Sequence, residues 1–132
     1  MCNVFKPERC HHCSACNRCV LNMDHHCPWI NNCVGFWNRK YFLLLLVYVL
    51  LGTYMTVIFA AYDFYEAIRW GFNNKMIGSN DPKLSNNLFI MIGYTLNGTV
   101  AGLMTVFLKF HLKLATENKT TIENLDKMGK PF

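Results

Sequence analysis

Residues 41–62 read YFLLLLVYVLLGTYMTVIFAAY and carry no charged side chain. At the rise of an α-helix this stretch covers about 30 Å, which is the thickness of the hydrocarbon core of a bilayer. Residues 88–108, LFIMIGYTLNGTVAGLMTVFL, form a second uncharged stretch. Neither stretch has the polar face that a helix of a soluble protein presents to water. We therefore predict two transmembrane helices, in preference to two buried core helices.

Between these stretches, residues 69–87 are rich in Asn, Gly, Ser and Lys and contain Asp81-Pro82, so we predict an exposed loop. The net charge of +5 comes from basic residues that lie mainly toward the two ends of the chain, which bears on membrane orientation more than on nucleic acid. Basic residues flank the outer ends of the two spans at Arg39, Lys40, Lys109, Lys113 and Lys119. Because positively charged flanks stay in the cytosol, both termini are predicted to be cytosolic.

Small and polar residues interrupt the second span. Gly93, Gly98 and Gly102 lie roughly one turn apart, a spacing that favours close contact between helices in lipid. Asn97 is polar in the middle of the same stretch, so we expect it to face another helix or a cavity instead of hydrocarbon.

The chain before residue 34 is different, because it holds all seven cysteines and four of the five histidines. An odd cysteine count, interleaved histidines and the lack of a cleavable signal pattern argue against a disulfide framework and favour a reducing, cytosolic setting. Successive cysteines from Cys10 to Cys19 have two residues between them, the gap that lets two thiolates bind one zinc ion. Two closed four-ligand zinc sites are possible, and zinc would supply the folding energy that this polar module lacks.

Asp24, His25, His26 and Cys27 are consecutive, so at most some of them can bind the same metal ion. A histidine beside a cysteine can take the thiol proton, and a carboxylate can orient that histidine and stabilise its charged form. That is the arrangement of an activated nucleophile. The alternative is that these residues are ordinary zinc ligands, and spacing alone leaves both readings open.

Several motifs extend beyond spacing: Lys6-Pro7-x-Arg9, His12-Cys13-x-x-Cys16-x-x-Cys19, Asp24-His25-His26-Cys27-Pro28-Trp29-Ile30-x-Asn32-Cys33-Val34-Gly35, Asn38 and, after the second span, Thr120-Thr121-Ile122-Glu123. Together they resemble the DHHC cysteine-rich domain and the TTxE motif of protein palmitoyltransferases. The resemblance implies a protein S-acyltransferase in which Cys27 attacks the thioester of palmitoyl-CoA, forms an acyl-enzyme and passes the acyl group to a protein cysteine. His25 is implied as the base, oriented by Asp24.

The resemblance also implies two structural zinc ions. One would be bound by Cys13, Cys16, His26 and Cys33. The other would take three ligands from Cys2, His12 and Cys19 and lacks its fourth, while Cys10 and His11 have no implied role. Thr120, Thr121 and Glu123 are implied to support the catalytic region, with Thr121 hydrogen-bonded near Asp24.

Family members have four transmembrane helices and a DPG motif, so we expect this chain to be N-terminally truncated, with Phe59 and Tyr62 as candidates for lining a partial acyl-chain cavity. An inactive zinc-binding membrane adaptor is the main alternative. The missing ligand and helices favour the adaptor, whereas the intact Asp24 to Cys27 quartet argues against it. A nucleic-acid-binding zinc finger would need a basic helix after the metal ligands, and a membrane span follows them here.

The predicted fold class is membrane α-helical, with a small loop-rich zinc-binding domain followed by two transmembrane helices. The predicted segments are a cytosolic domain at 1–40, spans at 41–62 and 88–108, a lumenal loop at 63–87 and a cytosolic tail at 109–132. Expected partners are fatty acyl-CoA, protein substrates with cytosolic cysteines and the lipid bilayer, without nucleic acid. The expected location is an endomembrane of the Golgi or endoplasmic reticulum.

Overall fold

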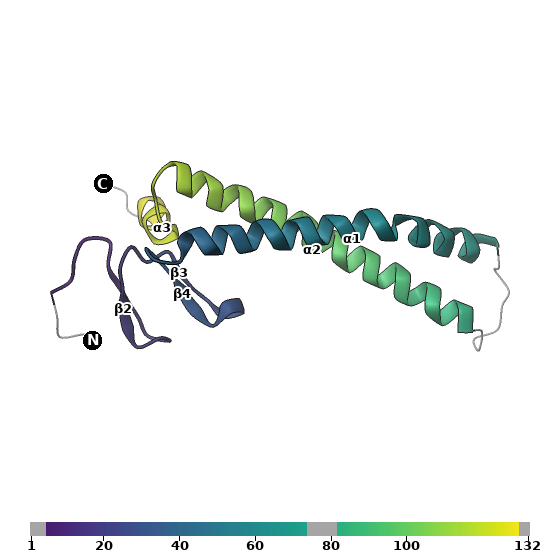
Figure 1. The fold of residues 1–132 in the computed structure, drawn as a ribbon, viewed down its shortest axis with the longest axis horizontal. Helices are drawn as coiled ribbons and strands as arrows, with labels where there is room; N and C mark the ends of the chain where they lie inside the picture. The colour runs from purple at the N-terminus through teal and green to yellow at the C-terminus, as the bar shows by residue number, and fades with distance from the viewer. Residues whose placement is uncertain (1–4, 74–81, 130–132) are drawn as a thin grey trace. The chain divides into compact units, whose positions relative to one another are not determined.

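The computed structural model describes residues 5–73 and 82–129, and the side chains of residues 5–73 and 82–126. The chain divides into two compact units. One unit is Met1–Leu46 with Leu108–Phe132, and it contains short strands together with the ends of two long helices (Figure 1). The other unit is Val47–Phe107, which contains the middle lengths of the same helices.

Two short antiparallel hairpins form the cysteine-rich part of the chain (Figure 1). The elements are β1 (His11–Cys13) paired with β2 (Arg18–Val20), and β3 (His25–Cys27) paired with β4 (Asn32–Val34), with the 3-10 helix η1 (Pro28–Ile30) inside the second turn. Each hairpin sets a histidine opposite a cysteine, since His12 pairs with Cys19 and His26 pairs with Cys33. Isolated hairpins are at best marginally stable in water, so these two need an additional tie.

Asparagine and glycine residues shape the turns of this unit. Asn17 and Asn31, one in each hairpin turn, have φ of 49° and 46°, a left-handed region that asparagine enters more readily than most residues. Gly35 follows β4 where the backbone passes close to the first hairpin. A Cβ on Gly35 would lie 2.7 Å from Val20 Cγ1 and 2.9 Å from the carbonyl oxygen of Leu21, so this approach requires glycine.

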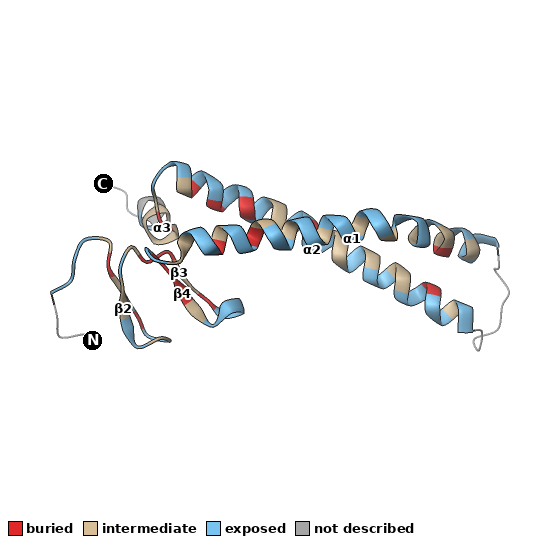
Figure 2. Cartoon of the chain, viewed as in Figure 1, coloured by how far each residue is buried: buried red, intermediate tan, exposed pale blue. Residues whose placement is uncertain are grey.

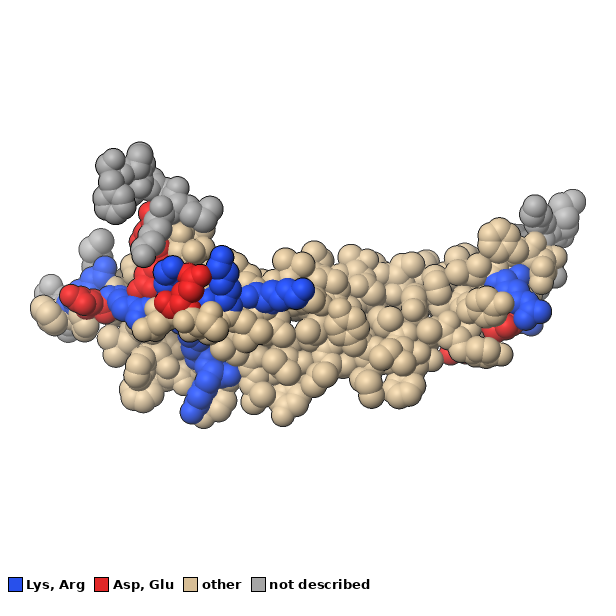
Figure 3. Space-filling model, turned by 90° about the horizontal axis from the view of Figure 1, so that it is seen from above, with Lys and Arg blue, Asp and Glu red and all other residues tan. Residues whose placement is uncertain are grey.

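Two long helices follow, α1 (Arg39–Asn73) and α2 (Pro82–Thr116), each of 35 residues. Both are long and apolar enough to cross a membrane, by length and composition. Their side chains are mostly exposed in this structure, as Figure 2 shows, so they do not form the buried core of a soluble domain. The face seen in Figure 3 carries its charged residues toward the helix ends and leaves the middle lengths uncharged.

The helices extend beyond the predicted spans, and the prediction of a loop over residues 63–87 is wrong at both ends. Residues 63–73 belong to α1 and residues 82–87 belong to α2, while residues 74–81 lie outside the described residues. The run of uncharged residues marks only the part of a helix that can lie in hydrocarbon. The helix itself continues beyond that part for as long as its backbone hydrogen bonds do. Pro82 suits the first turn of a helix, because the N–H that proline lacks would have no intrahelical partner there.

Within Val47–Phe107 the two helices contact each other through polar and aromatic side chains. Asn97 Nδ2 donates to the carbonyl oxygen of Thr53 at 3.0 Å and to Thr56 Oγ1 at 2.6 Å. The rings of Phe64 and Tyr94 stack with centroids 4.1 Å apart. The prediction that Asn97 faces another helix is therefore confirmed.

The close helix contact predicted at Gly93, Gly98 and Gly102 is not formed with α1. A Cβ built on any of these glycines meets no atom of the described residues within 4 Å, apart from its own helix backbone and chain neighbours.

The last element of the chain is a short helix, α3 (Thr121–Gly129). It belongs to the same unit as the hairpins, and its Ile122 packs against the buried cluster of Cys13, Met23 and Cys33. The residues predicted as a cytosolic tail are thus helical as far as residue 116 and again from residue 121.

Candidate active site and metal centre

A cluster of three cysteines and one histidine gathers where the two hairpins meet. His26 Nδ1 lies 3.6 Å from the sulfur of Cys13, 3.4 Å from that of Cys16 and 3.7 Å from that of Cys33. The Cys16 and Cys33 sulfurs are 3.4 Å apart, and all four donor atoms lie within 4.8 Å of one another. The structure therefore brings together the four residues implied as ligands of the first zinc ion.

The geometry and chemistry of this cluster fit a tetrahedral zinc ion. Zinc–sulfur distances of about 2.3 Å and zinc–nitrogen distances of about 2.0 Å give a tetrahedron with edges of roughly 3.5–3.8 Å. The Cys16 backbone N–H lowers the pKa of the Cys13 thiol, whereas burial and then hydrogen bonds with Cys13 and Cys16 raise the pKa of Cys33 to about 12. Three thiolates so close together need a cation between them, and a divalent metal supplies it.

The second implied zinc site is described only in part. His12 Nδ1 and Cys19 Sγ lie 3.8 Å apart across the first hairpin, because these residues are paired in its register. Cys2, the third implied ligand, lies outside the described residues. Cys10 is buried nearby in the chain, and the family resemblance implies no role for it.

The Asp24 carboxylate is fully buried and accepts hydrogen bonds on both of its oxygens. Oδ2 accepts from His25 Nδ1 at 2.7 Å and from Thr121 Oγ1 at 2.8 Å, and Oδ1 accepts from the Thr121 backbone N–H at 3.0 Å. Arg39 Nη2 lies 3.7 Å from Oδ1. Burial raises the pKa of Asp24, but the hydrogen bonds from His25 and Thr121 and the charge of Arg39 outweigh it and lower that pKa to about 2. Asp24 is therefore ionised at neutral pH.

The tautomer of His25 follows from this contact. An ionised carboxylate only accepts hydrogen bonds, so the Nδ1 that faces Asp24 carries the proton. In the neutral imidazole, Nε2 is then the basic nitrogen. Side chains alternate along a strand, so His25 and Cys27 leave β3 on one side while His26 leaves it on the other, toward the cysteine cluster. One three-residue strand thereby separates metal binding from the histidine–cysteine pair.

The Thr120-Thr121-Ile122-Glu123 motif forms a capping box at the start of α3. The Glu123 backbone N–H donates to Thr120 Oγ1 at 3.2 Å, and the Thr120 backbone N–H donates to Glu123 Oε2 at 2.9 Å. Thr121, the first residue of the helix, is thereby presented to Asp24. The contact between Thr121 and Asp24 that the resemblance implied is present in the structure.

A second tie joins the same turn to the cysteine-rich segment. The Arg9 guanidinium forms a bidentate ion pair with Glu123, in which Nη2 donates to Oε2 at 2.8 Å and Nε donates to Oε1. Nη2 also donates to the carbonyl oxygen of Asn118 at 2.9 Å. The hydrogen bond from Arg9 lowers the pKa of Glu123. The capping residue of α3 is therefore also an anchor for the segment that leads into β1.

Sequence reasoning missed three residues that surround the candidate catalytic pair. Arg39 was assigned to membrane flanking, yet it lies beside Asp24 and donates to the carbonyl oxygen of Lys119. The Phe42 ring makes an edge contact with the ring of His25, with centroids 5.1 Å apart. His111 is buried beside the same residues. The available signals were the three-residue spacing of Arg39 and Phe42 on one helix face, and a histidine within a predominantly apolar helix.

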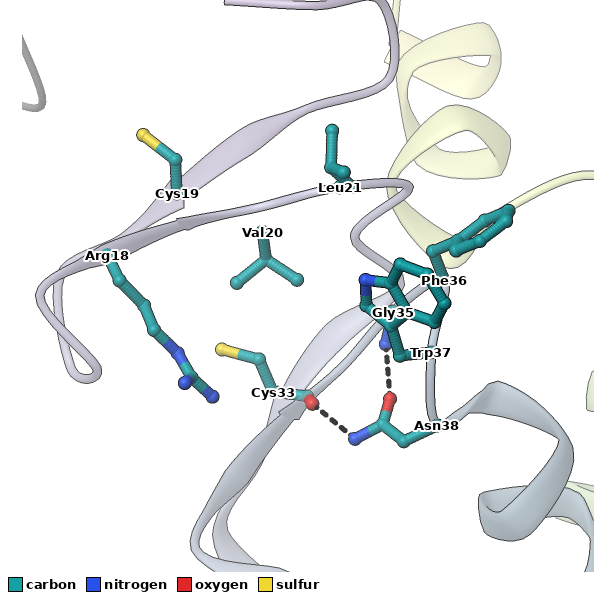
Figure 4. A pocket seen from close by; sticks show the side chains of 9 residues that line it. All are labelled: Arg18, Cys19, Val20, Leu21, Cys33, Gly35, Phe36, Trp37 and Asn38. Atoms are coloured by element: carbon teal, nitrogen blue, oxygen red, sulfur yellow. Dashed lines mark hydrogen bonds between the residues drawn. The ribbon is translucent and has the colours of Figure 1, made fainter. Parts of the chain in front are cut away.

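A hollow of about 350 Å³ lies on another side of the hairpins (Figure 4). Its walls come from β2, from the end of β4 and from the turn that leads into α1, where Asn38 accepts from the Gly35 N–H and donates to the Cys33 carbonyl oxygen. The lining residues are Arg18, Cys19, Val20, Leu21, Cys33, Gly35, Phe36, Trp37 and Asn38. Asp24, His25 and Cys27 do not line it, so this hollow is separate from the candidate catalytic residues.

Comparisons with known proteins find a matching family model and similar relatives. Residues 1–128 match the family model described as DHHC palmitoyltransferase. The chain is 43% identical to palmitoyltransferase PFA3 of Debaryomyces hansenii over 99% of its length, 40% identical to palmitoyltransferase ZDHHC2 of Mus musculus over 92%, and 41% identical to the probable protein S-acyltransferase 12 of Arabidopsis thaliana over 98%. It spans 32%, 31% and 42% of the lengths of these relatives.

Proposed function

Since the chain belongs to the DHHC palmitoyltransferase family, we propose that it is a protein S-acyltransferase that works through an acyl group on Cys27. The observation that carries the proposal is the buried Asp24 carboxylate, which holds His25 in one tautomer two residues before that cysteine. Palmitoyl-CoA, or another fatty acyl-CoA, is the proposed donor. The acceptors are cysteines of proteins that meet the membrane from the cytosol.

In the first step, His25 Nε2 takes the proton of the Cys27 thiol, and the Cys27 sulfur attacks the thioester carbonyl of the acyl-CoA. The carbon–sulfur bond to coenzyme A breaks, and the departing sulfur takes the proton from the His25 imidazolium. In the second step, His25 accepts the proton of a client cysteine, whose sulfur attacks the acyl-Cys27 thioester. Cys27 leaves and is reprotonated, so His25 ends each cycle unchanged.

Asp24 serves both steps through its hydrogen bond to Nδ1. It keeps the basic nitrogen on the far side of the ring and stabilises the imidazolium that forms when the thiol gives up its proton. The carboxylate remains ionised throughout, because its pKa is about 2.

The proposed role of zinc at Cys13, Cys16, His26 and Cys33 is structural. Four protein donors close the coordination shell and leave no position for substrate, so the ion would supply folding energy and not Lewis-acid catalysis. Because His26 lies between His25 and Cys27 on β3, binding of His26 would hold the position of both. A second zinc ion at Cys2, His12 and Cys19 is proposed with the same role.

We place both termini on the cytosolic side, since the basic residues concentrate at the outer ends of the two helices. This orientation puts Cys27 at the cytosolic surface of the bilayer, where a fatty acyl chain can lie among the helices while its thioester stays in reach. The compartment proposed is an endomembrane of the Golgi or endoplasmic reticulum. The acyl-enzyme would itself be a transient lipoprotein.

Autoacylation tests the proposal. The protein is expressed in membranes, supplied with alkyne-tagged palmitoyl-CoA and assayed for label that hydroxylamine removes. We expect label in wild type and none in Cys27→Ser. Cys10→Ser is the matched control, since Cys10 is also buried but lies outside the described four-residue metal cluster, and it should stay labelled.

Two outcomes would refute the proposal. Wild-type protein that contains zinc but takes up no label would instead indicate a membrane adaptor. Equal labelling of wild type and Cys27→Ser would show that another nucleophile carries the acyl group.

A further inference from the structure

His111 is the fifth histidine of the chain, and it lies near the end of α2, 86 residues after His25. Its side chain is only 4% exposed although the helix around it is otherwise apolar or basic. Burying a polar ring costs free energy unless polar or charged groups lie beside it, so a buried histidine at this position needs such neighbours. That environment is the Asp24–His25 pair.

The rings of His25, Phe42 and His111 pack against one another beside Asp24. The His111 ring lies 5.7 Å from the His25 ring and 5.2 Å from the Phe42 ring, and Phe42 lies 5.1 Å from His25, with all distances measured between centroids. The His25–Phe42 and Phe42–His111 pairs meet edge to face, at 71° and 76°. His111 Nδ1 is 3.9 Å from Asp24 Oδ2, the oxygen that accepts from His25. Each ring therefore touches the other two, with α1 and α2 each contributing one.

A hydrogen bond to Asp24 leaves one motion of His25 unrestrained. The bond fixes the position of Nδ1, but the imidazole can still tilt about the line that joins Nδ1 to the carboxylate. Rings packed on the imidazole restrict that tilt, and so determine where Nε2 points. Phe42 from α1 and His111 from α2 occupy the positions that such a restraint requires.

We propose that His111 is a positioning residue for the acyl-transfer reaction, and that its ring, together with Phe42, holds the His25 imidazole in the orientation that directs Nε2 to the reacting thiol. This inference rests on the proposed function. It assigns His111 no proton transfer and no contact with substrate. Its effect is on the rate of the chemical step, because a small misorientation of a base can cost up to about a hundredfold.

A metal site at Asp24, His25 and His111 is the competing explanation, since their donor atoms lie within 4.8 Å of one another. The surroundings of Asp24 disfavour it. Both carboxylate oxygens already accept hydrogen bonds from His25 and Thr121, and the Arg39 guanidinium lies 3.7 Å from Oδ1. A metal ion would have to displace those hydrogen-bond donors, and it would lie next to the positive charge of Arg39.

The test measures initial rates of acyl-Cys27 formation in membranes over a range of palmitoyl-CoA concentrations, with metal content determined for each variant. We expect His111→Ala to lower the maximal rate by about tenfold or more, with an unchanged KM for palmitoyl-CoA and unchanged zinc. His111→Phe keeps a flat ring and should stay within about threefold of wild type. His111→Leu fills similar space without a flat ring and should be slow.

Leu108→Ala is the matched control, because Leu108 is buried on α2 one turn before His111. It should lower stability without lowering the maximal rate. Loss of zinc would reveal that His111→Ala fails to fold. In that case the maximal rates of His111→Phe and His111→Leu are compared to test the proposal.

The proposal is overturned if His111→Phe, with normal zinc, is as slow as His111→Leu, or if His111→Ala matches wild type or Leu108→Ala in maximal rate. A metal equivalent that is present in wild type and lost in His111→Phe would overturn it in favour of the metal site. Wild-type protein without label refutes the proposed function itself, which is a distinct result.

Discussion

Replacing Thr121 by valine removes the hydroxyl that donates to Asp24 Oδ2 at 2.8 Å and keeps the β-branched shape of the side chain. The backbone N–H of residue 121 still donates to Oδ1. Loss of a buried hydrogen bond to a charged group costs about 1.5–3 kcal/mol. Oδ2 also orients His25, so we expect this cost to reach the transition state and slow acyl-Cys27 formation by roughly 10- to 100-fold.

The assay is the initial rate of hydroxylamine-sensitive labelling by tagged palmitoyl-CoA in membranes, together with zinc content. Thr121→Ser restores the hydroxyl and is the matched control, which should recover most of the rate. A Thr121→Val protein that binds zinc normally and labels within about twofold of wild type would show that this hydrogen bond does not support acyl transfer. So would a Thr121→Ser protein as slow as the valine variant.

Three further predictions concern other parts of the same unit. The Arg9–Glu123 coupling measured by a double-mutant cycle of thermal unfolding should be about 1 kcal/mol or more and should stay constant from pH 8 to 6. Arg9 lowers the pKa of Glu123 in the folded state, so the stabilisation from this pair is fully present above the pKa of the unfolded carboxyl. It is lost only as the pH falls through the lower pKa of the folded state. A coupling energy that declines above pH 6 would contradict this. Cys33→Ser should remove one zinc equivalent and unfold the hairpins, as seen by metal analysis and proteolysis, and retention of the full zinc content would show that another set of ligands is used. Gly35→Ala should destabilise by about 1–3 kcal/mol in thermal unfolding, while Gly52→Ala, where a Cβ meets nothing within 4 Å, should not; equal melting temperatures would contradict the close approach at Gly35.

The capping box gives the TTxE motif a physical reading. Thr120 and Glu123 satisfy each other's backbone donors at the start of α3, and Glu123 also binds Arg9. Between them, Thr121 supplies two of the three hydrogen bonds that Asp24 accepts. The turn that starts the last helix thus aligns the candidate catalytic carboxylate, and damage to the cap should weaken the reaction without touching the reacting atoms.

Elements that depend on local pattern could be predicted from the sequence alone. A run of 22 uncharged residues predicts a membrane-crossing helix whatever lies next to it, because the requirement comes from lipid. Cysteines separated by two residues and a nearby histidine predict a zinc site for a similar reason, since the metal needs such donors at short range. Spacing left open which residues bind the metal and which react, and only the resemblance to a family separated His26 from His25 and Cys27.

The tertiary structure decided what depends on contacts between distant segments. Thr121 meets Asp24 across 97 residues, and Arg9 meets Glu123 across 114, so no local pattern records either pair. His111 reads as a polar residue in an apolar helix until the end of α2 brings it to the His25 ring. Gly93, Gly98 and Gly102 of α2 show the same dependence on tertiary structure, because their spacing favours close packing but does not say against which helix, and they make no such contact with α1. Periodicity and ligand spacing are properties of a segment, whereas the surroundings of Asp24 arise only when the two helix ends and the hairpins come together.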